Sequence, residues 1–321
     1  MFGRRRPACG ELDDPHRGLR DDPGVTDLAV MAVAQHGGSA TASEIVALAG
    51  RHRLRTAVAA GRLVRTRRGT YVLDGSGDDV IAASTAGGVV AGPSAAVRHG
   101  WPLLRQPREV TVLVPRNRGL RRVPPSVRIL WADLAADEHS DGLTSPVRTV
   151  LDCARLLPFR EALAVADAAV RLGGITRTDL VAAAASLRGP GAPGIRRVAR
   201  SATPLAANPP ESALRADALD AAPGFVAQPD LLLRDGARRH PDVGHPGLRI
   251  ALECDSFAHH GHRDALTADC WRYTEFALAG WHVQRYAWEH LMRHPGWVRE
   301  TIAEAVAMRS GLPPDMQKRN T

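Results

Sequence analysis

Apolar positions between residues 25 and 73 recur first at the spacing of short helices and then at that of strands. A first helix is predicted from Val25, and the pair Gly37-Gly38 ends its pattern. Thr41-x-x-Glu44 has the form of a capping box, in which each residue satisfies a backbone amide of the other. A second helix is therefore expected directly after Thr41.

A third helix and a two-stranded wing follow. The helix is expected from Arg51 to Ala60, with Leu54 and Val58 facing inward. Residues 63–73 then place two apolar runs around two adjacent arginines and a glycine, as in a hairpin. Three short helices and a wing predict a winged helix-turn-helix over residues 25–74, in which the last helix enters a DNA major groove and the wing touches the phosphate backbone.

This first region is strongly basic. No acidic residue occurs between Arg51 and Leu73. The arginines expected to contact DNA are Arg51, Arg53, Arg55, Arg65, Arg67 and Arg68. The alternative is that they form the solvated basic face of a small protein-interaction module.

The next 120 or so positions, residues 79–200, predict a mixed α+β and helical region. Residues 80–100 are expected to be helical with a break at Gly92-Pro93, and strands are expected over Val110–Val114 and Val127–Trp131. The alanine-rich helices expected after these strands begin at Pro146, Ala162 and Thr178. Gly189–Gly194, with the sequence GPGAPG, is expected to break the structure.

Residues 205–310 predict a third region in which elements follow the order α-β-β-β-α-β, ending in a further helix. The expected elements are a helix over 211–219, strands near 226–233, at Asp242 and at Glu253, a helix over 265–279, a strand over 281–286 and a helix over 295–308. The whole chain is therefore expected to be a multidomain α/β protein. Residues 1–24 and 311–321 lack periodicity and are expected to be tails.

Carboxylates gather around one short strand of this third region. Leu248, Ile250 and Leu252 alternate with polar positions, which places Glu253 and Asp255 together on the opposite face. Turn chemistry just upstream returns the chain antiparallel, so Asp242 is expected near Glu253. Hard oxygen ligands of this kind suit Mg²⁺ or Mn²⁺, and such a cation activates water for phosphodiester hydrolysis. The alternative is that these are solvated or arginine-paired residues near a sheet edge.

Composition favours a polyanionic partner. The chain has 321 residues, a net charge of +8 and a pI near 10.2, and its length suggests two or three domains. Basic surfaces bind nucleic acid because neutralising phosphates releases counterions. Lys318 is the only lysine in the sequence, so the positive charge is almost entirely arginine. The alternative is that this balance reflects a general compositional bias.

Cysteine usage and hydropathy bear on location. The four cysteines, at positions 9, 153, 254 and 270, form no CxxC pair, which indicates neither a zinc ribbon nor a disulfide framework. No run of eighteen apolar residues occurs, and the N-terminal arginines precede no apolar segment. A cytoplasmic protein without a membrane span is expected.

Two motifs in the first region, GGSATASEIVALAG and GRLVRTRRGTYVL, resemble the winged-helix domain of AbiEi-type antitoxins from abortive-infection toxin–antitoxin systems. The runs GPSAAVRHGWPL, VTVLVPRNRG and LTSPVRTVLDCARLLPFREALAVADAAVR resemble the segment that follows it in the same proteins. The resemblance implies duplex DNA and a cognate toxin as partners. The nucleotidyltransferase motif of related antitoxins, Gly-Ser followed by Asp-x-Asp, does not occur in this segment.

Four motifs near the C-terminus carry a second resemblance: PESALRADAL, Pro241-Asp242, LRIALECDSFAHHG and DCWRYTEFALAGWHVQRYAWEHLMRHPGWV. They resemble a family related to very-short-patch-repair endonucleases, within the PD-(D/E)XK superfamily of restriction-endonuclease-like folds. The resemblance implies that Asp242 and Glu253 ligate the metal with the backbone carbonyl of Cys254. It also implies that Glu211 holds a metal-bound water.

The sequence departs from the superfamily pattern at one position. The superfamily lysine falls two residues after Glu253, where this chain has Asp255. Very-short-patch-repair enzymes use a histidine instead, and that histidine matches His259, which is expected to act as general acid or base. His260 is the weaker candidate, and the alternatives are an exposed histidine turn or a zinc site.

Arginines of the third region are candidates for binding the scissile phosphate. Arg272 is expected on the same helix face as Asp269 and Glu275, and Arg285 on the last strand. A surface salt bridge is the alternative role for Arg272. The aromatic residues expected to be core anchors are Trp281, Tyr286, Trp288 and Trp297.

Two functions from different classes follow. The first is a metal-dependent DNA endonuclease delivered to duplex DNA by its winged helix. The second is an antitoxin-like transcriptional regulator whose nuclease-like region is inactive.

Overall fold

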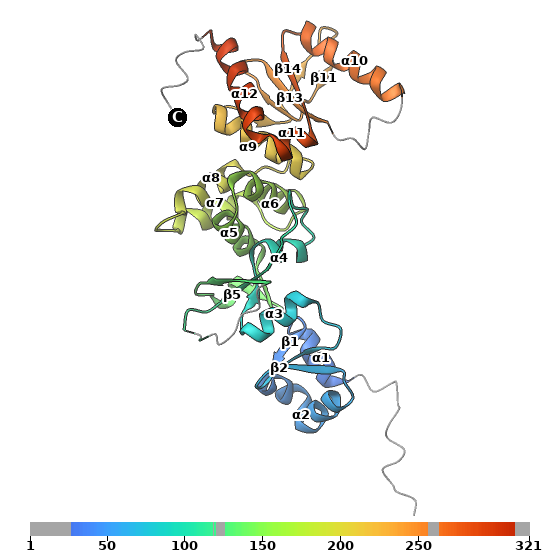
Figure 1. The fold of residues 1–321 in the computed structure, drawn as a ribbon, viewed down its shortest axis with the longest axis vertical. Helices are drawn as coiled ribbons and strands as arrows, with labels where there is room; N and C mark the ends of the chain where they lie inside the picture. The colour runs from blue at the N-terminus through green and yellow to red at the C-terminus, as the bar shows by residue number, and fades with distance from the viewer. Residues whose placement is uncertain (1–26, 118, 120–125, 256–262, 312–321) are drawn as a thin grey trace, which may run out of the picture. The chain divides into compact units, whose positions relative to one another are not determined.

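A computed structural model describes residues 27–117, 119, 126–255 and 263–311 (Figure 1). His259, His260 and most positions of the two expected tails lie outside these ranges. The chain divides into two compact units, with the boundary between Gly75 and Ser76. Several sheets and helices make it a mixed α/β protein, as expected.

The described part of the first unit, residues 27–75, contains two helices and a three-stranded antiparallel sheet of order β1-β3-β2. Its elements are α1 (Leu28–Gln35), β1 (Ser39–Thr41), α2 (Ala42–Ala59), β2 (Leu63–Arg67) and β3 (Thr70–Leu73). The backbone of α2 leaves helical geometry at Gly50 (φ 82°, ψ 159°), so two helical segments meet there. These segments correspond to the second and third helices expected from the sequence.

Local chemistry explains where α2 begins. The backbone amide of Thr41 donates to Glu44 Oε2 at 2.7 Å, and the Glu44 amide donates to Thr41 Oγ1 at 3.3 Å, which confirms the capping box. One expectation for α2 is wrong, because Val58 is 36% exposed and Ala57 is buried in its place. Ala57 joins Ile45, Leu54 and Leu63 in one apolar cluster.

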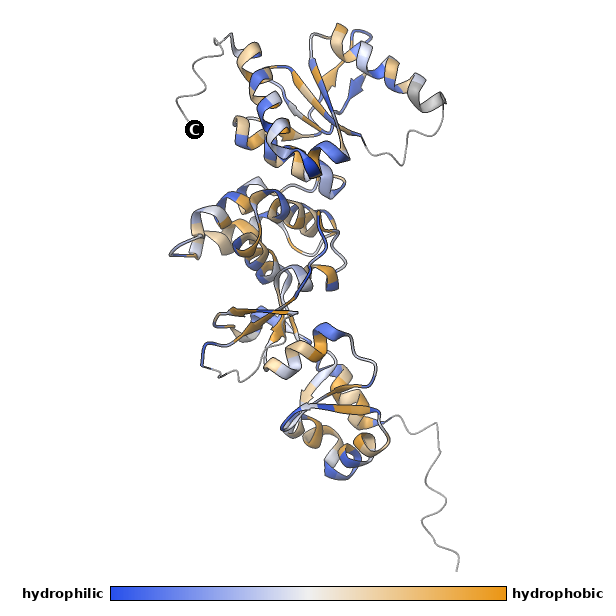
Figure 2. Cartoon of the chain, viewed as in Figure 1, coloured by the Kyte–Doolittle hydropathy of each residue, from blue (hydrophilic) through white to orange (hydrophobic). Residues whose placement is uncertain are grey.

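The residues described in the second unit form a run of helices and three sheets. Its α-helices are α3 (Asp78–Ala86), α4 (Gly92–Arg98), α5 (Pro146–Leu156), α6 (Phe159–Arg171), α7 (Arg177–Ser186), α8 (Ala192–Ser201), α9 (Pro209–Ala221), α10 (Arg263–Leu278), α11 (Trp288–Arg293) and α12 (Pro295–Ser310). One apolar cluster lies among α4 to α8 and includes Trp101, Val165, Leu180 and Ile195. Figure 2 shows apolar positions along these helices.

The five-stranded sheet of this unit has the order β6-β5-β4-β8-β7. Its strands are β4 (Val89–Val90), β5 (Val110–Val114), β6 (Val127–Trp131), β7 (His139–Ser140) and β8 (Leu143–Thr144). The expected helix over residues 80–100 is wrong in its middle, where β4 pairs with β5. A Cβ at Gly88 would collide with the Leu113 carbonyl oxygen, so only glycine allows this close approach.

A second difference concerns the GPGAPG stretch, which was expected to break the structure. It contains the start of α8, with Pro193 in the first turn of the helix. Residues 189–191 precede α8 as a turn, with positive φ at Gly189 and Gly191.

The four-stranded sheet of the second unit has the order β14-β13-β12-β9. Its strands are β9 (Val226–Ala227), β12 (Val243–His245), β13 (Ile250–Asp255) and β14 (His282–Ala287), and the hairpin β10 (Leu231–Leu232) and β11 (Arg238–Arg239) forms a separate two-stranded sheet. β12 runs antiparallel to β13, with Val243 opposite Leu252, whereas β13 and β14 are parallel. The order α9, β9, β12, β13, α10, β14 follows the expected one, but the strand expected near residues 226–233 is split into β9 and β10, which belong to different sheets.

Both faces of this sheet are covered. Ile250 and Leu252 pack with residues of α9 and α12, while Ala251 packs with Phe276 of α10 and the β10–β11 hairpin. Among the expected aromatic anchors, Tyr286 is buried, but Trp288 and Trp297 are 40% and 46% exposed. Trp297 nevertheless contacts the Tyr286 ring edge-on.

Buried ion pairs join α6 to α9. Asp167 accepts two hydrogen bonds from Arg215 Nη2, at 2.9 and 2.8 Å, and both side chains are buried. Asp217, which is fully buried, pairs with Arg160 of α6 at 3.0 Å and Arg299 of α12 at 3.2 Å. These pairs hold the helices that position the four-stranded sheet.

Candidate functional site

The arginines of the second segment of α2 are open to solvent. Arg51, Arg53 and Arg55 are exposed, while Leu54 and Ala57 between and after them are buried. The segment therefore packs through its apolar residues and presents guanidinium groups outward. Figure 2 shows this part of α2 as hydrophilic.

The hairpin β2–β3 carries the remaining arginines of the basic region. Arg65 and Arg68 are exposed, and Arg67 is half-buried. Arg65 Nε donates to the Arg67 carbonyl at 3.2 Å, and Arg67 Nε donates to Thr70 Oγ1 at 3.1 Å. These bonds fix the two guanidinium stems along the hairpin, while Arg68 stands at its turn.

The C-terminal carboxylates meet where β12 and β13 lie side by side. Asp242 immediately precedes β12, and its Oδ2 accepts a hydrogen bond from the Cys254 amide of β13 at 2.8 Å. Glu253 is only 4% exposed. Asp242 lies close to Glu253, as expected, because Val243 pairs with Leu252 and Asp242 accepts from the residue that follows Glu253.

Burial dominates the electrostatics of this pair. It raises the pKa of Asp242, and together with the Asp242 charge it raises the pKa of Glu253 to about 8. Burial also raises the pKa of the Cys254 thiol to about 12, so this residue offers a backbone carbonyl rather than a thiolate. Two close carboxylates of this kind, one buried and one half-buried, are strongly stabilised by a cation placed between them.

In the structure, arginines supply that positive charge. Arg272 Nη2 donates to Glu253 Oε1 at 2.9 Å and to the His240 carbonyl at 3.0 Å. Arg285 donates to Asp255 at 2.8 Å and to Asp269 at 3.2 Å, and its guanidinium lies 4.1 Å from the centre of the Tyr273 ring. Arg272 and Arg285 were expected to bind a phosphate, and here both are paired with carboxylates.

Glu211 lies at the start of α9 and is bound mainly to its own helix end. Its oxygens accept hydrogen bonds from the Ala207 amide at 2.8 Å and from Asn208 Nδ2 at 2.7 Å. Burial, with a further contribution from Asp242, raises its pKa to about 7. Glu211 is therefore near enough to Asp242 to feel its charge, but its oxygens are already hydrogen-bonded.

Within the described ranges, no group of three or more histidine, cysteine or acidic side chains has the geometry of a metal site. Asp242 and Glu253 supply two carboxylates, and the Cys254 carbonyl is the expected third donor. His259 lies outside the described residues, so its expected role stays a prediction. The oxygen ligands of this pair suit a hard divalent cation, although Glu253 forms an ion pair with Arg272 in the structure.

Sequence reasoning missed two features beside this site. The ion pair between Arg272 and Glu253 joins residues on different elements, so spacing along one helix gave no signal for it. Trp271 precedes Arg272 on α10 and is 70% exposed.

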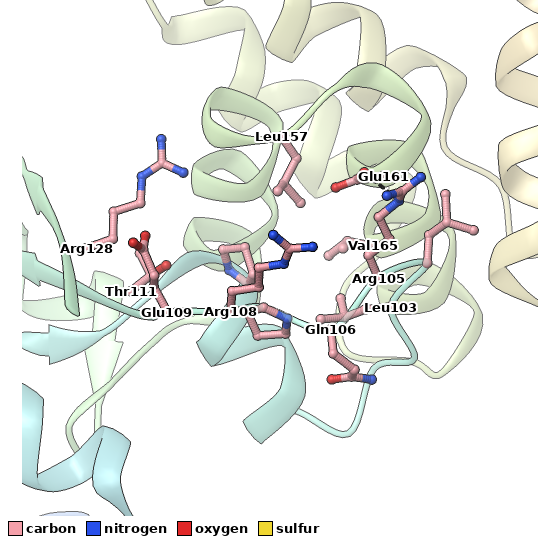
Figure 3. Close-up of a pocket in the computed structure, with 13 residues that line it drawn as sticks. Leu103, Arg105, Gln106, Arg108, Glu109, Thr111, Arg128, Leu157, Glu161 and Val165 are labelled. Atoms are coloured by element: carbon pink, nitrogen blue, oxygen red, sulfur yellow. Dashed lines mark ion pairs between the residues drawn. The ribbon is translucent and has the colours of Figure 1, made fainter. Parts of the chain in front are cut away.

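A separate cleft of about 610 Å³ lies between the five-stranded sheet and the helices α5 and α6 (Figure 3). Arg108 extends toward Leu157 across this cleft, and Arg105 pairs with Glu161 at 3.6 Å. None of the residues expected to bind DNA or a metal lines it.

Comparison with known proteins supports the family resemblance of the first region. A family model described as "Transcriptional regulator, AbiEi antitoxin" matches residues 28–73. No curated protein matches the chain. The solved structure of the RV2827C protein from Mycobacterium tuberculosis is similar over 55% of this chain and 77% of its own, with 16% identity and a TM-score of 0.30, which is too low to carry an argument.

Residues 28–73 are thus similar to a transcriptional-regulator and antitoxin module, as the motifs of this region predicted. No helix in the described part of the chain is long and apolar enough to cross a membrane.

Proposed function

We propose that the chain is a DNA-binding transcriptional regulator of the antitoxin type, whose first unit binds duplex DNA. The observation that carries this proposal is the exposed row Arg51, Arg53 and Arg55, which lies on the α2 segment within the region matched by the regulator family. In a winged helix this segment enters the major groove, and the β2–β3 hairpin contacts the phosphate backbone. The family description also implies a toxin as the protein partner.

Three arginines that neutralise phosphates contribute to the salt dependence of binding. The triple variant Arg51→Gln, Arg53→Gln, Arg55→Gln should weaken binding to duplex DNA from upstream of the gene and lower the slope of log K against log salt by roughly three. Fluorescence anisotropy at several salt concentrations measures both quantities.

A matched control removes the same charge from the second unit: Arg108→Gln, Arg116→Gln, Arg128→Gln. These arginines are also exposed. The control should retain nearly the whole salt slope. Equal losses in the two variants would show that net charge alone drives binding, and the proposal would fail.

A second function, hydrolysis of a phosphodiester, is favoured by one specific observation: half-buried Asp242, just before β12, lies beside buried Glu253 of the adjacent strand β13. Asp242, Glu253 and the Cys254 carbonyl would hold Mg²⁺ or Mn²⁺. Such a cation, when bound, polarises a phosphate and lowers the pKa of a water. Glu253 would exchange its ion pair with Arg272 for the cation, and the Arg272 guanidinium would then be free to hold a phosphate oxygen.

Asp255 is the main departure from the superfamily pattern, because it carries negative charge at the lysine position. Arg285 neutralises Asp255 at 2.8 Å, which reduces repulsion of a phosphate there. The arginine therefore compensates in part for the missing lysine. The general acid or base in this proposal remains His259.

Metal binding and cleavage are tested separately. Mn²⁺ should raise the melting temperature of the wild type, and the rise should disappear in Glu253→Gln. Nicking of plasmid in Mg²⁺ or Mn²⁺ should be lost in Asp242→Asn. Absence of nicking with either metal, or nicking that survives Asp242→Asn, rules out hydrolysis at this site and leaves the regulator proposal intact.

A further inference from the structure

A cavity of about 1000 Å³ lies beside α10, between that helix and the chain around the β10–β11 hairpin. The side chains that matter in its lining are Arg234, Asp235, Arg239, Trp271, Arg272 and Glu275. It is open to the surface and combines an aromatic ring with guanidinium groups. The regulator and hydrolysis proposals leave most of these residues without a role.

Trp271 is the unusual member of this lining. At 70% exposure it is the most exposed large apolar side chain among the described residues. No ring stacking or cation–π contact of Trp271 occurs in the part of the chain that the structure describes. Covering a solvent-facing indole of this kind with a flat apolar group is favourable, because it removes apolar surface from water.

The arginines of this lining, Arg234, Arg239 and Arg272, outnumber its carboxylates, Asp235 and Glu275. Glu275 is paired with Arg234 at 2.8 Å, and Asp235 accepts a hydrogen bond from the Ala237 amide at 2.9 Å. Arg239 donates to a backbone carbonyl, that of Arg238, and forms no ion pair with a described carboxylate. Arg239 therefore keeps its full charge for an anion entering the cavity.

Arg272 connects the cavity to the carboxylate site. It lines the cavity, and the same side chain donates to Glu253 at 2.9 Å. A polymer with a phosphate at Arg272 would thus have its neighbouring unit beside Trp271. The repeating alternation of anion and flat ring that this requires is that of a nucleic acid strand.

We propose that this cavity binds an unpaired segment of nucleic acid, with one base stacked on Trp271 and the flanking phosphates at Arg239 and Arg272. The base must be unpaired, because both faces of a base inside a duplex are covered by its neighbours. The inference rests on the proposed action of the carboxylate site on nucleic acid and specifies its substrate as single-stranded or locally opened. It requires no cleavage in order to be tested.

The test measures binding in EDTA, so that a failure of hydrolysis has no effect on the result. The parent protein is the full chain carrying Arg51→Gln, Arg53→Gln and Arg55→Gln, which reduces the contribution of the first unit. The probes are a 12-nucleotide DNA strand with a central 2-aminopurine, the RNA of the same sequence and the corresponding duplex. Anisotropy gives affinity, and quenching of 2-aminopurine reports stacking.

Both single strands, or one of them, should bind more tightly than the duplex and be quenched. Trp271→Ala should abolish quenching and weaken binding roughly tenfold, as for the loss of one base–aromatic stack. Trp271→Phe should retain part of both signals. Leu278→Ala is the control, because Leu278 is a 54% exposed apolar residue of the same helix that does not line the cavity.

The phosphate contact has its own matched pair. Arg239→Gln should weaken binding and lower the salt slope by about one, whereas Arg238→Gln should change neither by as much. Arg238 is the adjacent residue of β11, outside the cavity lining, and pairs with Asp230 at 3.1 Å.

Unchanged binding in Trp271→Ala, or a duplex that binds as tightly as the strands, overturns the inference. Strand binding without cleavage in Mg²⁺ or Mn²⁺ would uphold it and reject only hydrolysis.

Discussion

Arginine has opposite roles in the first unit and in the C-terminal part of the second. On α2, Arg51, Arg53 and Arg55 point to solvent in a stretch without acidic residues. In the C-terminal part, Arg215 and Arg272 are bonded to carboxylates that are themselves buried. The arginines available to bind a polyanion are therefore mainly those without a carboxylate partner.

The difference separates binding from folding. A free, exposed guanidinium gains energy when it meets a phosphate and costs the fold little when it is removed. A buried guanidinium compensates a carboxylate, so its removal leaves an unpaired charge in a medium that solvates it poorly. Substitutions in the two regions should thus affect different measurements.

The largest effect is expected for Arg215→Ala. This change leaves Asp167 buried without its partner, and the free energy of unfolding should fall by about 3–5 kcal/mol. Urea unfolding followed by circular dichroism measures the loss. Arg53→Ala is the comparison from the first unit and should change stability by less than about 0.5 kcal/mol. Similar losses in the two variants would break the contrast between the regions.

A smaller effect is expected from the pH dependence of Asp217. Burial, the largest influence on this carboxyl, raises its pKa from 3.8 to about 6, although Arg160 and Arg299 oppose the rise. Because the folded-state pKa is above the unfolded value, the contribution of this proton to stability is complete below pH 4 and is lost as the pH rises through 6.

Asp217→Asn stays neutral and lacks this dependence. The free energy of unfolding of the wild type minus that of Asp217→Asn should therefore decrease by roughly 2 kcal/mol between pH 4 and pH 7. Urea titrations at unit pH intervals measure it. A difference that increases with pH would mean that the two arginines outweigh burial.

The smallest effect concerns Arg62, an arginine of the basic region that pairs with a carboxylate. Arg62 pairs with Asp27 at 3.0 Å, but its side chain is 50% exposed. Arg62→Ala should lower the free energy of unfolding by at most about 1 kcal/mol. Asp27→Asn keeps the acceptor for the Ala29 amide and removes only the charge, so a double-mutant cycle isolates the pair. A coupling free energy as large as that of a buried ion pair would contradict the interpretation that exposure weakens the pair of Arg62 with Asp27.

Local patterns predicted much of the fold. The capping box at Thr41, the glycines that end α1, and the return of the chain before β13 each depend on residues within a few positions of one another. Their interactions are decided by neighbours in sequence, so composition and spacing suffice. The proximity of Asp242 to Glu253 followed from the same local turn.

Contacts between residues far apart in the sequence could not be predicted in this way. β4 is a two-residue strand that exists because β5 and β8 flank it. The pairing of Arg272 with Glu253 joins α10 to β13. None of these has a signature in spacing, because the partner is supplied by the fold.

The bend of α2 has a consequence for engineering. Gly50 adopts a positive φ with no atom near the place of a Cβ, so the bend depends on backbone conformation rather than on lack of space. A side chain there would favour a different path for the chain and so redirect the segment that carries Arg51, Arg53 and Arg55. Anyone grafting a new recognition helix onto this scaffold would therefore need to transfer the glycine along with the contact residues.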